Sequence, residues 1–179
     1  MEKYNNRNDI IRGNKVNLRP ITMDDTELIV NWRNEESVRK YFIFRDDFTN
    51  EMHNKWMKTK VETGEVVQYI IEDADNNMPV GSVYFRDIDK KNRNAEFGIF
   101  IGEEKARGKG LGTEATRAFV EYGFKKIKLH RIMLRVLEEN KRAIKSYLNV
   151  GFEIEGQAKD MVYLDDEYQD VIFMSMIKK

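Results

Sequence analysis

The sequence predicts one mixed α/β domain in which a central mixed β-sheet carries helices on both faces. Along the chain the apolar pattern alternates between the period of two that is typical of strands and the period near 3.6 that is typical of helices. Turn signals join strands into hairpins early and late in the chain, whereas helices connect the strands near its middle. The length of 179 residues fits a single hydrophobic core.

The N-terminal elements follow from local signals. Residues 1–13 are mostly polar and predict a flexible arm, which leaves residues 14–179 as the domain. Alternation of apolar and polar residues over 16–21 predicts a strand. Thr22 precedes several acidic residues, a pattern typical of a helix start because the helix dipole favours negative charge there. A second helix is expected over 49–61.

The rest of the chain reads as strands separated by helices. The nearly continuous apolar run over 95–101 is typical of a central strand buried on both faces. Gly151 is a typical residue just after the end of a helix. In order, we expect strands over 66–71, 80–88 and 95–101, a helix over 111–126, a strand over 131–137, a helix over 141–150, and strands over 152–164 and 168–177.

Composition excludes several classes of function. The 31 basic and 31 acidic residues cancel, so the chain lacks the basic excess that is typical of nucleic-acid binding. The absence of cysteine and the presence of only two histidines exclude cysteine-ligated and three-histidine metal sites, so no metal is expected. No apolar run is long enough to span a membrane, and the N-terminus does not resemble a signal peptide. We therefore expect a cytoplasmic protein with no nucleic-acid or membrane partner.

A glycine-rich segment joins the expected central strand to the next helix. Arg107-Gly108-Lys109-Gly110-Leu111-Gly112 has three glycines at alternate positions, which suits a backbone whose N–H groups converge on a ligand. A helix N-terminus favours anions, and the nearby cationic side chains add positive charge. The alternative is a tight turn with solvated basic residues. The spacing matches neither the dinucleotide-binding fingerprint nor the phosphate-binding loop of nucleotide hydrolases.

Two motifs resemble those of the GNAT superfamily of acetyl-CoA-dependent N-acetyltransferases. Arg107, Gly110 and Gly112 fit the family's coenzyme A signature R/Q-x-x-G-x-G/A. The segment 140–152 is similar to the family motif N-x-x-A-x-x-x-Y-x-x-x-G-F, and Glu139 would be the acidic residue that often precedes it. The resemblance extends over residues 14–179 and is greatest to the subgroup that holds ribosomal-protein alanine, spermidine and amino-sugar N-acetyltransferases.

The resemblance implies the GNAT fold, with about seven mostly antiparallel strands, a splayed central strand and about four helices. It implies acetyl-CoA as co-substrate and no metal. The backbone of the splayed strand would pair with the pantetheine arm, and the glycine-rich segment would bind the pyrophosphate through N–H groups. The implied cofactor-binding residues are Ile99, Phe100, Ile101, Arg107, Gly108, Lys109, Gly110, Leu111, Gly112, Thr113 and Asn140.

Two residues are candidates for acid–base catalysis. Tyr147 falls on the tyrosine of the family motif and would protonate the leaving thiolate; the alternative is a core aromatic residue. Glu96 is a carboxylate in an otherwise apolar strand, which is costly unless it is paired or functional. It would remove a proton from the amine, directly or through water, and the alternative is a salt bridge to Arg93 or Arg131.

The distribution of charge along the chain suggests the acceptor. Residues 105–149 hold 12 basic and 4 acidic side chains, as a polyanionic coenzyme requires, whereas both flanking segments are net acidic. Because the flanking segments would shape the acceptor site, we expect a small cationic amine, such as a polyamine or an amino-sugar. A protein N-terminus as acceptor, and a non-enzymatic acyl-CoA sensor, remain alternatives. A homodimer is possible.

Overall fold

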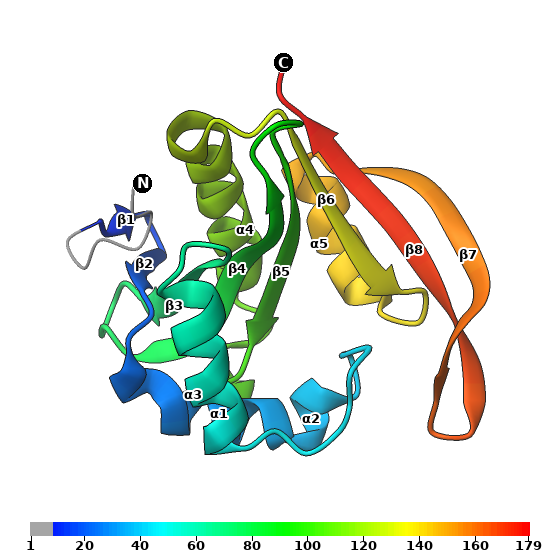
Figure 1. Cartoon of the computed structure of the whole chain (residues 1–179), viewed down its shortest axis with the longest axis horizontal. Coiled ribbons are helices and arrows are strands. Elements are labelled where there is room, and N and C mark those ends of the chain that lie inside the picture. Colours follow the sequence, from blue (N-terminus) through cyan, green and yellow to red (C-terminus); the bar gives the residue numbers. More distant parts are fainter. Residues whose placement is uncertain (1–8) are drawn as a thin grey trace.

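Eight strands form one sheet in residues 9–179, the part of the chain that this computed structural model describes. The strand order is β1-β2-β3-β4-β5-β6-β8-β7 (Figure 1), and every neighbouring pair is antiparallel except β5 and β6. The strands are β1 (Ile11–Arg12), β2 (Val16–Pro20), β3 (Val67–Asp73), β4 (Pro79–Asp89), β5 (Asn94–Ile101), β6 (Arg131–Leu137), β7 (Glu153–Leu164) and β8 (Glu167–Ile177).

Five α-helices cover the two faces of this sheet in the described residues. They are α1 (Thr26–Asn34), α2 (Glu36–Arg39), α3 (Asn50–Trp56), α4 (Leu111–Tyr122) and α5 (Lys141–Val150). Helix α3 continues into a π-helical turn over Met57–Val61, and α4 continues into another over Gly123–Ile127. Short 3₁₀ turns precede α1 and α4, at Met23–Asp25 and Glu104–Ala106.

Two cores, one on each face, hold these layers together. Alternate residues of a strand face opposite sides, so Tyr69 and Phe85 pack toward α4, whereas Ile70 packs toward α1 and α3. The α4 side holds the larger core, where Phe85 stacks on Phe119 with ring centroids 4.5 Å apart. The smaller core on the other side includes Trp32.

The mixed α/β sheet with helices on both faces is confirmed. The predicted helices and strands follow one another along the chain in the predicted order. The sheet has one strand more than the expected seven, because Ile11 and Arg12 pair with β2. Ile11 and Arg12 therefore belong to the sheet and not to the flexible arm expected over 1–13. Residues 1–8 of that arm lie outside the described part of the chain. Helix α2 was not predicted. The helices expected over 49–61 and 111–126 end in π-helical turns.

The central pair of strands separates partway along its length. Parallel pairing between β5 and β6 covers only Asn94–Glu96 and Arg131–Met133. Beyond Glu96, β5 stays paired with β4, and β6 stays paired with β8. Residues 97–101 therefore have one edge without a neighbouring strand, which confirms the expected splay. Unpaired N–H and C=O groups on such an edge are available to a ligand.

Close packing fixes α1 against the end of β5. A Cβ built on Gly102 would lie 2.2 Å from the Trp32 ring, so only glycine fits there. The Trp32 Nε1–H also donates a 2.8 Å hydrogen bond to the carboxylate of Glu103. The loop after β5 and the first helix are thus joined by a ring and a hydrogen bond.

The substitution Gly102→Ala should lower the free energy of unfolding by about 1–3 kcal/mol, because overpacking forces the indole or the backbone to move. Gly156→Ala is the matched control, since a Cβ at Gly156 meets nothing within 4 Å. Urea unfolding followed by tryptophan fluorescence measures both. Equal stability of the two variants would contradict the tight contact.

A buried histidine joins α1 to α3. His53 is 1% exposed, and its Nδ1 lies 2.9 Å from the Thr26 hydroxyl. That hydroxyl donates to Asn54 at 3.2 Å, so it accepts from the Nδ1–H of His53, which leaves Nε2 unprotonated. Burial lowers the pKa of His53 to about 4. The packing role that is usual for an isolated histidine therefore holds here.

Lowering the pH from 7.5 to 4.5 should cost the folded state about 2–3 kcal/mol through His53 alone. The folded pKa lies below the unfolded value of 6.5, so the stability is full above pH 6.5 and is lost as the pH falls toward 4. Urea unfolding of the protein and of His53→Gln at both pH values measures this. The variant should lose less stability than the parent; an equal loss would assign the acid sensitivity to other groups.

Candidate functional site

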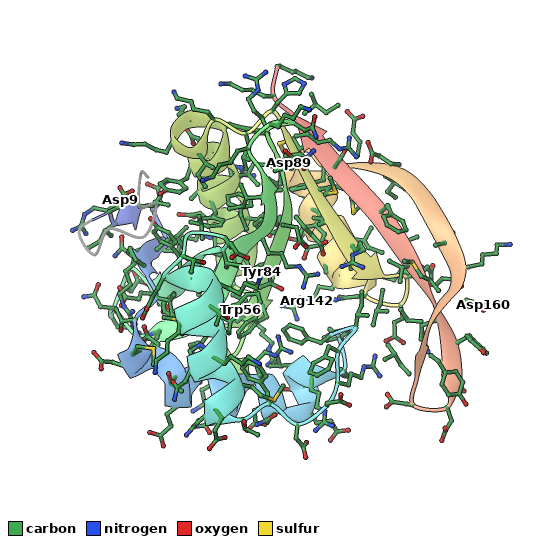
Figure 2. All side chains as sticks on the ribbon, viewed as in Figure 1. Asp9, Trp56, Tyr84, Asp89, Arg142 and Asp160 are labelled. Carbon is green, nitrogen blue, oxygen red and sulfur yellow. The ribbon has the colours of Figure 1, made fainter. Side chains whose placement is uncertain are left out.

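A cavity of about 750 Å³ opens along the free edge of β5. This volume lies within the range of ligand-binding pockets. Its lining comes from both helical layers: α4 and α5 contribute on one side, and α1, α3 and β4 contribute on the other. Figure 2 shows Trp56, Tyr84 and Arg142 gathered around this space from three different elements. Because β5 and β6 separate here, side chains from both faces of the sheet can line the same cavity.

The glycine-rich segment forms one end of the cavity. Gly108 and Gly110 have φ angles of +84° and +83°, in the left-handed region that disfavours side chains. Gly110 directly precedes α4, so the first N–H groups of that helix face the cavity without a preceding turn to bond them. An Arg142 guanidinium nitrogen lies 3.7 Å from the point where a Cβ on Gly108 would be. This combination suits a phosphate group.

Arg107 braces the same segment through its side chain. Its guanidinium donates to the backbone carbonyls of Ile101 at 3.2 Å and of Gly102 at 3.0 Å. Arg107 therefore fixes the path from β5 to the glycines, and its charge stays beside the cavity that it lines. Lys109, by contrast, is exposed and does not line the cavity.

The other predicted cofactor-binding residues come together here. Ile99, Phe100 and Ile101 line the cavity along β5. Gly112 packs on Ile101, because a Cβ built on Gly112 would lie 3.4 Å from the Ile101 side chain. Helices α4 and α5 are tied by a 2.7 Å hydrogen bond between the hydroxyls of Thr113 and Ser146. Leu111, Thr113 and Asn140 also line the cavity. Asn140 in addition caps α5, because its side-chain oxygen accepts from Ala143 N at 3.2 Å.

Tyr147 lines the cavity from α5. Its ring packs edge-on against Phe97 of β5, with centroids 6.2 Å apart, and against Phe152. The residue is 8% exposed yet lines the cavity, and within the described residues its hydroxyl has no hydrogen-bond partner. Burial raises the pKa of the phenol above its ordinary value, so the hydroxyl keeps its proton at neutral pH.

Glu96 is held by two arginines. Its carboxylate accepts from Arg86 of β4 at 2.6 Å and from Arg135 of β6 at 3.2 Å. The sequence suggested Arg93 or Arg131 as the ion-pair partner; Arg86 takes that place because it lies directly opposite Glu96 in the β4–β5 register. Glu96 thus lies where β5 and β6 begin to separate, on the face that α1 and α3 cover.

Sequence reasoning missed several cavity residues. Arg33 comes from α1, Tyr84 and Arg86 from β4, and Arg135 from β6. The tyrosine and arginine of β4 alternate with buried Val83 and Phe85, a pattern that indicates a second face with its own role. Of the two tryptophans, Trp56 lines the cavity and Trp32 belongs to the core.

Residues 40–49, the loop between α2 and α3, cover the α1 side of the cavity. Phe42, Phe44 and Phe48 line it from this loop. Arg45 forms an ion pair with Asp165 in the β7–β8 turn and lies 3.8 Å from Glu139, next to α5. The loop therefore reaches across the opening between the two halves of the sheet (Figure 1) and encloses this part of the cavity.

Residues 9–179 hold neither a metal site nor a membrane-spanning helix. No group of three or more histidine, aspartate or glutamate side chains is arranged to hold a metal ion there. Within the same residues, no helix is both long and apolar enough to cross a membrane.

Sequence comparison finds relatives that are acetyltransferases. The chain is 29% identical over 170 residues to the spermidine N(1)-acetyltransferase of Vibrio cholerae, which covers 93% of this chain and 95% of that protein. It is also 29% identical over 171 residues to the spermidine N(1)-acetyltransferase of Escherichia coli K12, covering 93% and 88% of the two chains. Residues 15–153 match the family model described as an acetyltransferase (GNAT) domain.

Solved structures show the same arrangement. The crystal structure of the Vibrio cholerae spermidine N-acetyltransferase in complex with CoA and spermine has a TM-score of 0.85 and 26% identity, over 91% of this chain and 95% of that one. The fold of this chain is thus shared with a protein whose structure contains CoA. The chain belongs to the GNAT family and is an acetyl-CoA-dependent N-acetyltransferase.

Proposed function

We propose that the protein transfers the acetyl group of acetyl-CoA directly to the primary amine of a small molecule, with both substrates bound at once. The observation that carries this proposal is a single cavity that joins the glycine-rich segment, the free edge of β5 and the Tyr147 hydroxyl. Holding two reactants in line converts a bimolecular step into an effectively unimolecular one. No covalent acetyl-enzyme is needed, and the chain has no cysteine nucleophile to form one.

The chain's own residues account for binding and orientation. Bound acetyl-CoA supplies a thioester, whose acetyl carbon the amine attacks while the C–S bond breaks. The N–H groups at the start of α4, with Arg142 beside them, suit the phosphates. The unpaired groups of residues 97–101 suit the amide groups of the pantetheine arm.

Tyr147 is the proposed general acid. Tyr147 lines the cavity, its hydroxyl has no hydrogen-bond partner among residues 9–179, and burial keeps it protonated. A phenol in that state has a proton to donate to the leaving thiolate as negative charge develops on the sulfur. Packing against Phe97 and Phe152 fixes the ring, so the hydroxyl is held in place before the reaction.

A small acceptor suits this cavity better than a protein N-terminus. The phenylalanine-rich loop over 40–49 covers the acceptor side, and Arg45 anchors it across the opening. The relatives support the same choice, since two of them are named for a small polyamine, spermidine. One spermidine acetyltransferase structure from Vibrio cholerae is dodecameric, which supports self-association of this chain as well.

The substitution Tyr147→Phe should lower kcat by about 10²-fold or more while leaving coenzyme binding within a fewfold, because only the proton donor is removed. Thiol release from acetyl-CoA with an amine panel measures kcat, and titration calorimetry measures coenzyme affinity. Tyr163→Phe is the matched control, since that residue is 60% exposed on β7. Unchanged turnover would remove the acid role. Tight coenzyme binding with no thiol release from any amine would favour an acyl-CoA sensor.

Glu96→Gln separates two roles of the carboxylate. If Glu96 removes the proton from the amine, the variant should lose the limb of the pH–rate profile that reports a base. If Glu96 only holds Arg86 and Arg135, the profile should keep its shape and the KM of the amine should rise, because both guanidinium groups lose their anchor. Rate profiles of the parent protein and of the variant between pH 6 and pH 10 distinguish these two roles of Glu96.

A further inference from the structure

The charge on the acceptor side of the cavity is opposite to the charge expected from the sequence. Among the described residues its lining holds one carboxylate, that of Glu96, and six cationic side chains: Arg33, Arg86, Arg107, Arg135, Arg142 and Lys145. Apart from Glu96, the acidic residues of the flanking segments therefore lie elsewhere in the described part of the chain. A polyamine, which carries several positive charges, would enter a cavity of its own sign.

The coenzyme's phosphates do not account for all of these cations. Arg142 and Lys145 project from α5, beside the glycine-rich segment. Arg86, in contrast, lies opposite Glu96, five residues along β5 from Ile101, against which Gly112 packs. At ~3.3 Å per residue that is about 17 Å along the strand. Arg33 and Arg86 therefore belong to the acceptor side, on the face that α1 and α3 cover.

Arg33 has no anionic partner in the described residues. Its guanidinium lies 3.8 Å from the centroid of Phe42 and 4.8 Å from that of Phe48. These contacts orient the group but do not neutralise it. Its Nε is buried without a hydrogen-bond partner, and so is the Nε of Arg86. The carboxylate of Asp87 lies 3.7 Å from the Arg86 Nε, beyond hydrogen-bond distance. Buried donors that lack a hydrogen bond are costly unless a ligand supplies the acceptor.

Arg33 and Arg86 also lie close enough to repel each other. Burial and the charge of Arg86 both lower the pKa of Arg33. Glu96 is already shared between Arg86 and Arg135, and the Asp87 carboxylate, 3.7 Å from Arg86 Nε, does not line the cavity. Within the lining formed by the described residues, one carboxylate therefore faces three guanidinium groups on this side. The arrangement is stable against this repulsion when an anion lies between the arginines. Guanidinium groups match carboxylate and phosphate oxygens in geometry as well as in charge.

We propose that the acceptor is a primary amine that also carries an anionic group, a carboxylate or a phosphate, which Arg33 and Arg86 bind. This inference rests on the proposed acetyl transfer and names the substrate class of the same site. It also gives the cations a use in the reaction, because nearby positive charge favours the neutral, attacking form of the amine over the ammonium form.

Matched pairs of amines test the proposal. Each pair differs in the anionic group: ethanolamine with phosphoethanolamine, propylamine with β-alanine, glucosamine with glucosamine 6-phosphate, and a free amino-sugar with its nucleoside-diphosphate derivative; spermidine is the cationic comparison. Thiol release gives kcat/KM for each amine, and calorimetry gives binding of each amine to the coenzyme-loaded protein. At least one anionic member should exceed its neutral partner by about tenfold or more. Comparison of the pairs that contain a phosphate with the pair that contains a carboxylate shows which anionic group the site prefers.

Arg33→Gln should abolish that preference by raising the KM of the anionic amine about tenfold, with kcat and coenzyme affinity little changed. Arg33→Lys, which keeps the charge and loses the planar fork, should restore part of it. Arg117→Gln is the control, since that arginine is exposed on α4 and does not line the cavity.

The outcomes separate the two proposals. Efficient acetylation of spermidine or of the neutral amines, unaffected by Arg33→Gln, would overturn the anionic acceptor and leave the acetyl transfer intact. Thiol release from none of the amines would overturn the acetyl transfer to small amines. In that case calorimetry still tests the anionic acceptor site. Binding of an anionic amine that weakens in Arg33→Gln supports the site. Absence of binding for every anionic amine overturns it.

Discussion

The short parallel pairing between β5 and β6 is the constraint on which the rest of the site depends. It holds the two halves of the sheet together at Asn94–Glu96 and then stops, so the strands separate over residues 97–101. Had the pairing continued, the edge groups of β5 would be satisfied by β6, and side chains from α5 could not meet those from α1 in one cavity. The partners beyond the split, β4 on one side and β8 on the other, keep each half rigid.

The split also sorts charge into two places. Cations from α5 gather at the glycine-rich segment, where the chain's backbone N–H groups already favour an anion. A second group comes from α1, β4 and β6, and two of its members, Arg86 and Arg135, form ion pairs with Glu96. The two groups are separated along β5, and Tyr147 packs against Phe97, the residue that follows Glu96.

Sequence reasoning recovered what local signals encode. Thr49 caps α3, Gly151 ends α5 with a φ of +114°, and the strands from β3 to β8 lie within about two residues of their predicted bounds. The glycine-rich segment and Tyr147 belong to motifs contained in short stretches of chain, so they too were identified. Helix α2 is only four residues long and has too little periodicity to predict.

The charge on the acceptor side of the cavity could not be predicted from the sequence, for a physical reason. Net charge over a long segment averages residues that face opposite ways, whereas a cavity is lined by the few that turn inward. Arg33 and Arg86 are separated by 52 intervening positions and meet only through the packing of α1 on β4. Glu96 could be recognised as a costly carboxylate, but its partner depended on the register between two strands.

The unpaired edge of β5 has a thermodynamic consequence. A ligand that completes the hydrogen bonding of residues 97–101 binds the folded chain and has no equivalent site on the unfolded one. Its binding free energy is then added to the stability of the fold, in proportion to the logarithm of its concentration over its dissociation constant. For this family the ligand is acetyl-CoA, so the fraction of the protein that is folded becomes linked to the supply of that co-substrate.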